Sequence, residues 1–518
     1  MSLNPANDSA SAMKTSTAIR IAAALLLAGC TVGPDYVRPT APMPAEYKEA
    51  GWQVAQPADA INPGAWWDIY RDPELDGLER QIDVSNQNLK AANAAFHQAE
   101  AIVTQARAGF FPTETVTAAA QRSRGGGGGG SAAVAAAVGG GGGGGRISNF
   151  FSLSESASWV PDLWGKVWRT VEGDIATAQA SAGDVASARL SAQGSLASDY
   201  LQLRIADELK RLLDDAVKAY TESLRIVRNQ YNAGVAAASD VAQAETQLEN
   251  ARAQAIAVGV TRAQLEHAIA VLVGKPPAEL TIAPVQQAIA VPEVPAGVPA
   301  ALLERRPDVA AAERRMASAN AQIGVFEAAF FPNITLTGNM GAQSSMLRHL
   351  LSESSRVWSF GGNLVQTVFD AGSRHAQIEQ ARATYDANVA DYRQAVLTAF
   401  QQVEDELAAL RIQAQQYQAA EAAVRASREA ARIIFNQYMA GTVAYTNVVI
   451  AQTAALSNAE TALNIRQSRL VASAALIQAL GGDWKTTDLP SRERIESDYP
   501  LNFLPAPPPD TNPRFLWW

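Results

Sequence analysis

The chain has 518 residues, of which 48% are hydrophobic, with a single cysteine, four histidines and a formal net charge of −9 at pH 7. The negative charge argues against a nucleic-acid partner, because such partners are bound through basic surfaces. The apolar content is ordinary for a packed protein, and the length alone would allow several domains.

The first segment has the layout of a secretory signal that ends in a bacterial lipobox. A short apolar run from Ile21 to Ala28 follows positively charged residues, and the tetrapeptide Leu-Ala-Gly-Cys closes the segment at Cys30. We therefore expect residues 1–29 to be a signal peptide, with Met13 as an alternative start, and Cys30 to carry a covalent lipid. Cleavage before Cys30 would leave no other thiol, and hence no disulfide.

The rest of the chain carries one set of motifs twice. Phe110-Phe111-Pro112 recurs as Phe330-Phe331-Pro332, an offset of 220, whereas Asn-Gln-Tyr at 229–231 recurs at 436–438, an offset of 207. The first copy therefore holds extra residues, and they coincide with glycine tracts between 125 and 145 that cannot fill a core or hold a helix. We predict a single fold in which strand, loop, strand, long helix, tight turn and helix occur twice, with the glycine tract as a loop tip.

The predicted boundaries follow from this repeat. They are a signal peptide at 1–29, a lipidated N-terminal segment at 30–72, a first repeat at 73–276, a proline-containing connector at 277–299, a second repeat at 300–482 and a proline-rich C-terminal tail at 483–518. Each repeat is expected to contain a helix, a β-hairpin, a long helix and a return helix.

Stretches without proline predict long helices. Val167 to Gly234 and Asp370 to Gly441 would each reach roughly 100 Å at about 1.5 Å per residue. A return limb of about 60 Å follows each glycine, and a further helix of roughly 40 to 50 Å in each copy supplies the remaining length. Gly234 and Gly441 permit the positive φ that a tight turn between two helices needs.

The second long helix contains an apolar stripe. Its members are Val396, Phe400, Val403, Leu407, Leu410, Ala414 and Tyr417. Their spacing averages about 3.5 residues, which indicates a left-handed coiled-coil seam, although buried helices of an ordinary bundle would explain the stripe equally well.

After each Phe-Phe-Pro the pattern becomes alternating, which predicts strands. The predicted strands are Thr113 to Thr117, Phe151 to Trp159, Ile334 to Thr337 and Leu364 to Phe369. Beyond the N-terminal run, no apolar stretch approaches the roughly 18 residues of a membrane helix. A mature chain that crosses a membrane must then do so as a β-barrel. About eight strands is the smallest such barrel, so four strands require assembly with further copies, two giving eight and three giving twelve.

Catalytic and metal sites are not expected. The glycine tracts lack the order of a phosphate-binding loop. His97, His267, His349 and His375 stand far apart, with no partner at ligand spacing. We therefore expect no enzyme, no metal and no cofactor beyond the lipid on Cys30.

Five segments carry a family resemblance. They are Cys30-Thr31-Val32-Gly33-Pro34-Asp35-Tyr36, Trp66-Trp67 with Asp72-Pro73, Glu304-Arg305-Arg306-Pro307-Asp308, Ala329-Phe330-Phe331-Pro332 and Val403-Glu404-Asp405. In these segments the chain resembles outer-membrane efflux factors of the TolC superfamily, in the lipoprotein branch typified by OprM, CusC and NodT. The resemblance covers nearly all of residues 30–490.

The resemblance implies a mainly α fold, with a long α-helical barrel and a transmembrane β-barrel to which each protomer gives four strands and which closes only in a homotrimer. It implies an outer-membrane channel of a tripartite efflux pump that exports small molecules. The implied partners are outer-membrane lipid, a periplasmic adaptor (membrane fusion) protein and an inner-membrane transporter, usually of the resistance-nodulation-division type. An exit duct or structural envelope lipoprotein of another secretion system is the alternative, and neighbouring genes would discriminate between them.

The resemblance also implies a gate where the helical hairpins turn at the periplasmic end. Tyr438 and Asp240 match an inter-hairpin hydrogen-bonded pair of the family. Asn447 and Ile450 occupy positions where the family commonly has acidic residues around the closed aperture. We therefore expect this aperture to close more by packing than by electrostatics.

Overall fold

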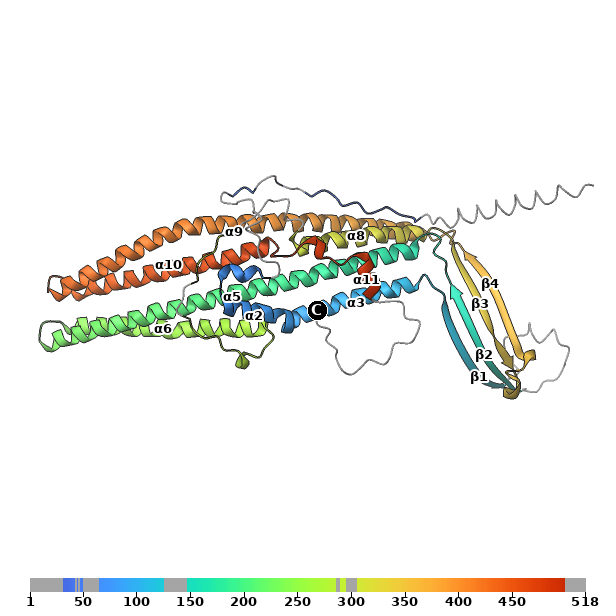
Figure 1. The fold of residues 1–518 in the computed structure, drawn as a ribbon, viewed down its shortest axis with the longest axis horizontal. Coiled ribbons are helices and arrows are strands. Elements are labelled where there is room, and N and C mark those ends of the chain that lie inside the picture. Colours follow the sequence, from blue (N-terminus) through green and yellow to red (C-terminus); the bar gives the residue numbers. More distant parts are fainter. Residues whose placement is uncertain are drawn as a thin grey trace, which may run out of the picture.

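The computed structural model describes residues 31–41, 44, 47–49, 65–124, 147–285, 289–294 and 305–498. This part of the chain is elongated, with four strands at one end and long helices that run side by side to two turns at the other end (Figure 1). The predicted signal peptide, Cys30, the glycine tract and the end of the C-terminal tail lie outside the described residues.

Two helical hairpins of equal dimensions form the long part of the molecule. Helix α5 (Lys166–Asn232) and helix α9 (Ser373–Met439) have 67 residues each, and their return helices α6 (Ala238–Leu272) and α10 (Tyr445–Ala479) have 35 each. At 1.5 Å per residue these helices are about 100 Å and about 52 Å long. Corresponding helix ends in the two hairpins are separated in the sequence by the same offset as the two Asn-Gln-Tyr motifs.

Shorter helices cover the part of α5 and α9 that the return helices do not reach. Helices α3 (Gln87–Ala108) and α8 (Pro307–Ala328) have 22 residues each, and α2 (Pro73–Ser85) precedes α3. Asn86 separates α2 from α3 because its side chain accepts a hydrogen bond from Leu89 N at 2.9 Å and so starts a new helix. The remaining short elements are η2 (Trp66–Tyr70), η3 (Pro277–Glu279), η4 (Leu347–His349), η5 (Glu353–Ser355), η6 (Thr486–Asp488) and α11 (Arg492–Asp498).

The strands form one antiparallel sheet in the order β1-β2-β3-β4. Its members are β1 (Thr113–Arg124), β2 (Ile147–Trp159), β3 (Asn333–Ser344) and β4 (Arg356–Val365). The predicted hairpins are present, and all four strands are longer than the alternation indicated. Strands β1 and β4 are the edges of this sheet, and neither has a second neighbour among the described residues.

The predicted fourth strand, Leu364 to Phe369, is wrong at both ends. Strand β4 begins at Arg356 and ends at Val365, which pairs with Asn333. The next partner along β3 would be Pro332, which has no N–H to donate, so pairing stops there. Beyond the strand, Gln366 Nε2 donates to Phe330 O at 3.0 Å, just as Trp159 Nε1 donates to Phe110 O at 3.0 Å in the first copy. The two Phe-Phe-Pro motifs thus serve the same junction.

The predicted seam on α9 is only half buried. Val396, Phe400, Val403 and Leu407 lie in one core cluster, whereas Leu410, Ala414 and Tyr417 are partly exposed. The main core lies about halfway along α5, a level that we call mid-height. There Trp66 (0% exposed) packs among α2, α5, α6 and α10.

Among the described helices, only α6 is long and apolar enough to cross a membrane, with a mean hydropathy of 1.2. The expectation that no stretch beyond the N-terminal run would reach this limit was wrong for that helix. Length and composition alone are weak evidence for a span. Helix α6 packs along α5, a helix with charged residues such as Lys210 and Asp214.

One buried carboxylate has no partner among the described residues. Glu79 on α2 is 0% exposed, and neither of its carboxylate oxygens has a hydrogen-bond partner. Burial, with a smaller contribution from Asp83, raises the pKa of Glu79 from 4.5 to about 9. The folded chain therefore holds this proton at neutral pH, while the unfolded chain releases it. The resulting stability is full below pH 4.5 and is lost as the pH rises through 9.

We predict that Glu79→Gln, which mimics the protonated form, removes this pH dependence. The difference in melting temperature between the variant and the wild type should grow in favour of the variant between pH 5 and pH 9, as measured by circular dichroism in detergent. Glu114→Gln, at an exposed position on β1, is the matched control and should follow the wild type. If the melting temperatures of the wild type and Glu79→Gln changed with pH in parallel, the carboxyl group would be ionised in the folded chain.

Candidate functional site at the tips of the helical hairpins

The two hairpin turns are built alike. Gly234 (φ +76°) follows α5 and Gly441 (φ +73°) follows α9. In each turn, the amide after the glycine donates back over five residues, from Val235 to Gln230 O at 2.8 Å and from Thr442 to Gln437 O at 3.0 Å. A Cβ at either glycine would meet no atom within 4 Å. The glycines are therefore required by the positive φ, not by close packing.

Tyr438 lies at the centre of a cluster that joins the two hairpins. Its side chain is 8% exposed, and its ring contacts Tyr445 edge-on with centroids 5.2 Å apart. Leu224 and Val227 of α5 and Val448 of α10 belong to the same apolar cluster. Residues of α5 and α6 therefore pack here against residues of α9 and α10.

The expected hydrogen bond between Tyr438 and Asp240 is not present. The Tyr438 hydroxyl donates to Gln230 Oε1 of α5 instead. Asp240 lies in the first turn of α6, where its carboxylate accepts from Ala237 N at 3.4 Å and caps the helix. Asp240 is still close enough to act on the tyrosine, since burial and then the Asp240 charge raise the pKa of Tyr438.

Asn447 and Ile450 lie on a different face of α10. Both are exposed, Ile450 to 63%, whereas Tyr445 and Val448 point into the cluster. A spacing of three residues places Asn447 and Ile450 on one side of the helix. Within one chain this face is available to line an opening.

Further links between the hairpins use uncharged side chains, which the sequence analysis missed. Thr446 Oγ1 donates to Gln243 Oε1 at 3.1 Å, and Gln247 Nε2 donates to Gln452 Oε1 at 3.2 Å. Gln452 Nε2 also donates to Ser223 Oγ at 3.5 Å. The spacing of Gln243 and Gln247, one helical turn apart on α6, was the available signal. We call these five residues, with Gln230 and Tyr438, the neutral latch.

Charged groups near the tips pair within a hairpin. Arg228 of α5 pairs with Glu245 of α6, and Arg432 pairs with Glu429 on α9 at 2.6 Å. A groove of about 420 Å³ lies beside the latch, between α6 and α10, and is lined by Tyr220, Ala242, Gln243, Thr246, Gln247, Asn250, Ala251, Gln254, Val449, Thr453 and Leu456.

The residues after Cys30 lie at the opposite end of the helices. Val32 N donates to Trp164 O at 3.4 Å, where β2 leads into α5. Arg169, 2% exposed, donates to Val32 O at 3.1 Å and to Asp35 Oδ1 at 2.9 Å. Further along, Lys48 N donates to Glu404 Oε1 at 2.6 Å. We call residues 31–49 the N-terminal strap. Where it is described, it runs from the sheet end towards mid-height (Figure 1).

The described ranges contain no candidate metal centre. No three histidine, cysteine, aspartate or glutamate side chains gather there in a way that could hold a metal ion. His97 pairs with Glu100 at 2.9 Å on one helix.

Comparisons with known proteins agree with this arrangement. The profile of the family described as Outer membrane efflux protein matches residues 78–275 and 298–482. The chain is 32% identical to the probable efflux pump outer membrane protein TtgC of Pseudomonas putida, over 89% of this chain and 94% of TtgC. It is 28% identical to the pyoverdine export outer membrane protein OpmQ of Pseudomonas aeruginosa, over 90% of this chain and 96% of OpmQ.

Solved structures share the fold. The outer-membrane channel OprN superimposes with a TM-score of 0.77 and 28% identity, over 88% of this chain and 99% of OprN. The open state of the Neisseria gonorrhoeae MtrE outer membrane channel gives a TM-score of 0.76 and 27% identity, over 88% of this chain and 99% of MtrE.

We predict that Tyr438 is coupled to Gln230 and not to Asp240. In a double-mutant cycle on channel opening, Tyr438→Phe and Gln230→Leu should be non-additive by about 1 kcal/mol, the usual net value of one hydrogen bond. Tyr438→Phe and Asp240→Ala should be additive. The measurement is open probability in single-channel recordings. The reverse pattern would restore the Tyr438–Asp240 pair as the link.

Proposed function

The chain belongs to the outer membrane efflux protein family, and from that premise we propose that it acts as a lipid-anchored homotrimer that forms the exit channel of a tripartite pump. An outer-membrane channel of an efflux pump, and not an enzyme, is the function that the family has. The observation that carries the finer proposal is the combination of a four-stranded sheet, whose two edge strands have no second neighbour in the part of the chain that the structure describes, with two equal helical hairpins.

The free edges support assembly of three copies. Strands β1 and β4 would each leave a row of backbone donors and acceptors unpaired in a membrane, where unpaired groups cost several kcal/mol each. Pairing β1 of one copy with β4 of the next satisfies both rows, and three copies give a closed barrel of twelve strands. The partly exposed half of the apolar stripe on α9, at Leu410, Ala414 and Tyr417, would pack against a neighbouring helix in the same assembly.

The hairpin tips are proposed as the periplasmic gate. The neutral latch holds the two hairpins of one chain together, and Asn447 and Ile450 are placed to line the opening. Hydrogen bonds of about 1 kcal/mol each are weak enough for a partner to overcome when it binds the open state better. We propose a periplasmic adaptor protein as that partner, and an inner-membrane transporter of the resistance-nodulation-division type below it.

The N-terminal strap supports the proposed lipid on Cys30. Thr31 lies next to Gly165, since an added Cβ there would come within 3.0 Å of Thr31 Cα. Cys30 directly precedes this point, so an attached lipid would start near the junction of sheet and helices, at the level where a barrel would meet the periplasmic surface of the membrane. Residues 1–29 would be removed as the signal peptide.

The exported compounds are proposed to be small molecules. The names of the relatives mention antibiotics, toluene and pyoverdine as exported compounds. Such different cargoes among similar channels support a duct that does not itself select the compound.

We predict that cells without this chain become more sensitive to pump substrates and that the wild-type chain restores resistance. The decisive variant carries Gln243→Cys and Thr446→Cys, which allow a reducible bis-methanethiosulfonate reagent to join α6 to α10. Export of a fluorescent substrate should stop on cross-linking and return after reduction, because the hairpins can no longer part. The single-cysteine variants are the controls. Undiminished export from a fully cross-linked channel would show that the gate does not lie at the tips.

We also predict that Cys30→Ala abolishes incorporation of radiolabelled palmitate. Because the sheet itself should hold the protein in the membrane, the variant should still assemble and fractionate with the outer membrane. Thr31→Ser, which preserves the cysteine, is the control. Absence of label from the wild-type protein would overturn the assignment of Cys30.

A further inference from the structure

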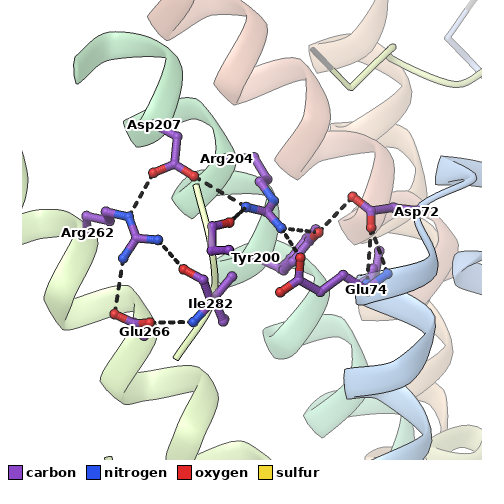
Figure 2. Close-up of polar contacts among 10 residues, drawn as sticks. Asp72, Glu74, Tyr200, Arg204, Asp207, Arg262, Glu266 and Ile282 are labelled. Atoms are coloured by element: carbon purple, nitrogen blue, oxygen red, sulfur yellow. Dashed lines mark hydrogen bonds and ion pairs between the residues drawn. The ribbon is translucent and has the colours of Figure 1, made fainter. Parts of the chain in front are cut away.

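The segment that joins the two repeats is held by side chains of the first hairpin (Figure 2). Arg262 of α6 donates through Nη2 to Ile282 O, and Glu266 of α6 accepts from Ile282 N at 2.6 Å. Both backbone polar groups of one residue are thus bound from α6. Asp207 of α5 accepts from Arg262 Nε at 2.7 Å, so the contact also includes the other helix of the hairpin.

A second arginine binds the same segment from α5 (Figure 2). Arg204 donates through Nη1 to Ala283 O at 2.7 Å and through Nη2 to Glu74 Oε2 of α2 at 2.6 Å. The guanidinium group also lies over the Tyr200 ring, 4.6 Å from its centroid, and the side chain is 4% exposed. Charge-assisted bonds in such a dry position are strong and directional.

A third arginine binds the segment from the second hairpin. Arg466 of α10 donates through Nη2 to Ile289 O, seven residues beyond Ile282, and through Nη1 to Glu208 of α5 at 2.8 Å. The Arg466 and Glu208 side chains are only 15% and 13% exposed. One short length of backbone is therefore bound by both hairpins. We call Arg204, Arg262 and Arg466, with the backbone oxygens they bind, the connector clamp.

Because the clamp lies far from the hairpin turns, a small rotation of the helices at the clamp moves the tips by a large distance. Helix α6 begins at Ala238 and α10 begins at Tyr445, so Arg262 and Arg466 each lie several helical turns beyond the hairpin turn. The clamp is thus roughly 35 Å from the hairpin turns. At this height the hairpins are joined through the connector, of which seven residues can span at most about 25 Å, and directly through the ion pair between Arg466 and Glu208. A rotation of about 10° over this length would move a tip by about 6 Å.

We propose that the connector clamp positions the two hairpins of one chain, so that its contacts set how readily their tips part. Arg466 is the positioning residue on the second hairpin, because it alone among the three binds the connector from α10. The proposal rests on the proposed function only in taking the tips as the gate. Packing alone would also stabilise this region, but packing would not make the spacing of the tips depend on an arginine at mid-height.

The test uses the pair Gln243→Cys and Thr446→Cys as a reporter, since Cys30 is the only natural cysteine. The rate at which the bis-methanethiosulfonate reagent joins α6 to α10 is measured by mass spectrometry on the assembled protein. Arg466→Met should slow this reaction several-fold. Arg432→Met is the matched control, because Arg432 is exposed and, among the described residues, pairs with Glu429 on its own helix. It should react at the same rate as the reporter pair alone.

Arg466→Lys provides a second test should Arg466→Met fail to assemble. Lysine keeps the charge beside Glu208 but cannot donate to the carboxylate and to Ile289 O in the same forked geometry. It should therefore also slow the reaction, by a smaller factor. If whichever of these two variants assembles reacts as fast as the reporter pair alone, the proposed role of the clamp is wrong.

Single-channel recording separates the clamp from the gate. Slower cross-linking with a raised open probability supports both proposals. Slower cross-linking with an unchanged open probability supports the clamp and contradicts the placement of the gate at the tips.

Discussion

The burial of two 67-residue helices is the constraint on which the rest of the structure depends. A helix of this length is stable in water only where neighbours cover its apolar face. Each long helix receives that cover in two pieces, a return helix of 35 residues and a helix of 22. The pieces meet at mid-height, and the connector and the cluster around Trp66 lie there because the chain has to cross from one piece to the other.

The sequence predicted most of this arrangement, since helix length depends on local signals. Gly234 and Gly441 ended the long helices where expected because only glycine takes the required φ without strain. Strand β4 was placed wrongly, because its end depends on Pro332 across the sheet and not on its own residues. The partner of Tyr438 was missed for a similar reason. Which side chain meets its hydroxyl depends on how α5 and α9 are rotated, and Asp240 is occupied in capping α6.

The hairpins are joined by different kinds of contact at mid-height and at the tips. At mid-height the hairpins share buried ion pairs and charge-assisted bonds, such as Arg466 with Glu208. Near the tips they share amides, hydroxyls and aromatic rings, while charges such as Arg228 and Glu245 pair within one hairpin. Screening by salt acts on charges and little on neutral hydrogen bonds. The tips should therefore part with similar ease over a wide range of ionic strength.

The equal lengths of the hairpins have a geometric consequence. Because α5 matches α9 and α6 matches α10 residue for residue, both turns of one chain end at nearly the same distance from the sheet (Figure 1). In three copies around an axis, the six hairpin turns would end at the same level and form an even rim. Such a rim suits a flush, end-to-end joint with another tube, in which leakage is limited by how evenly the two edges meet.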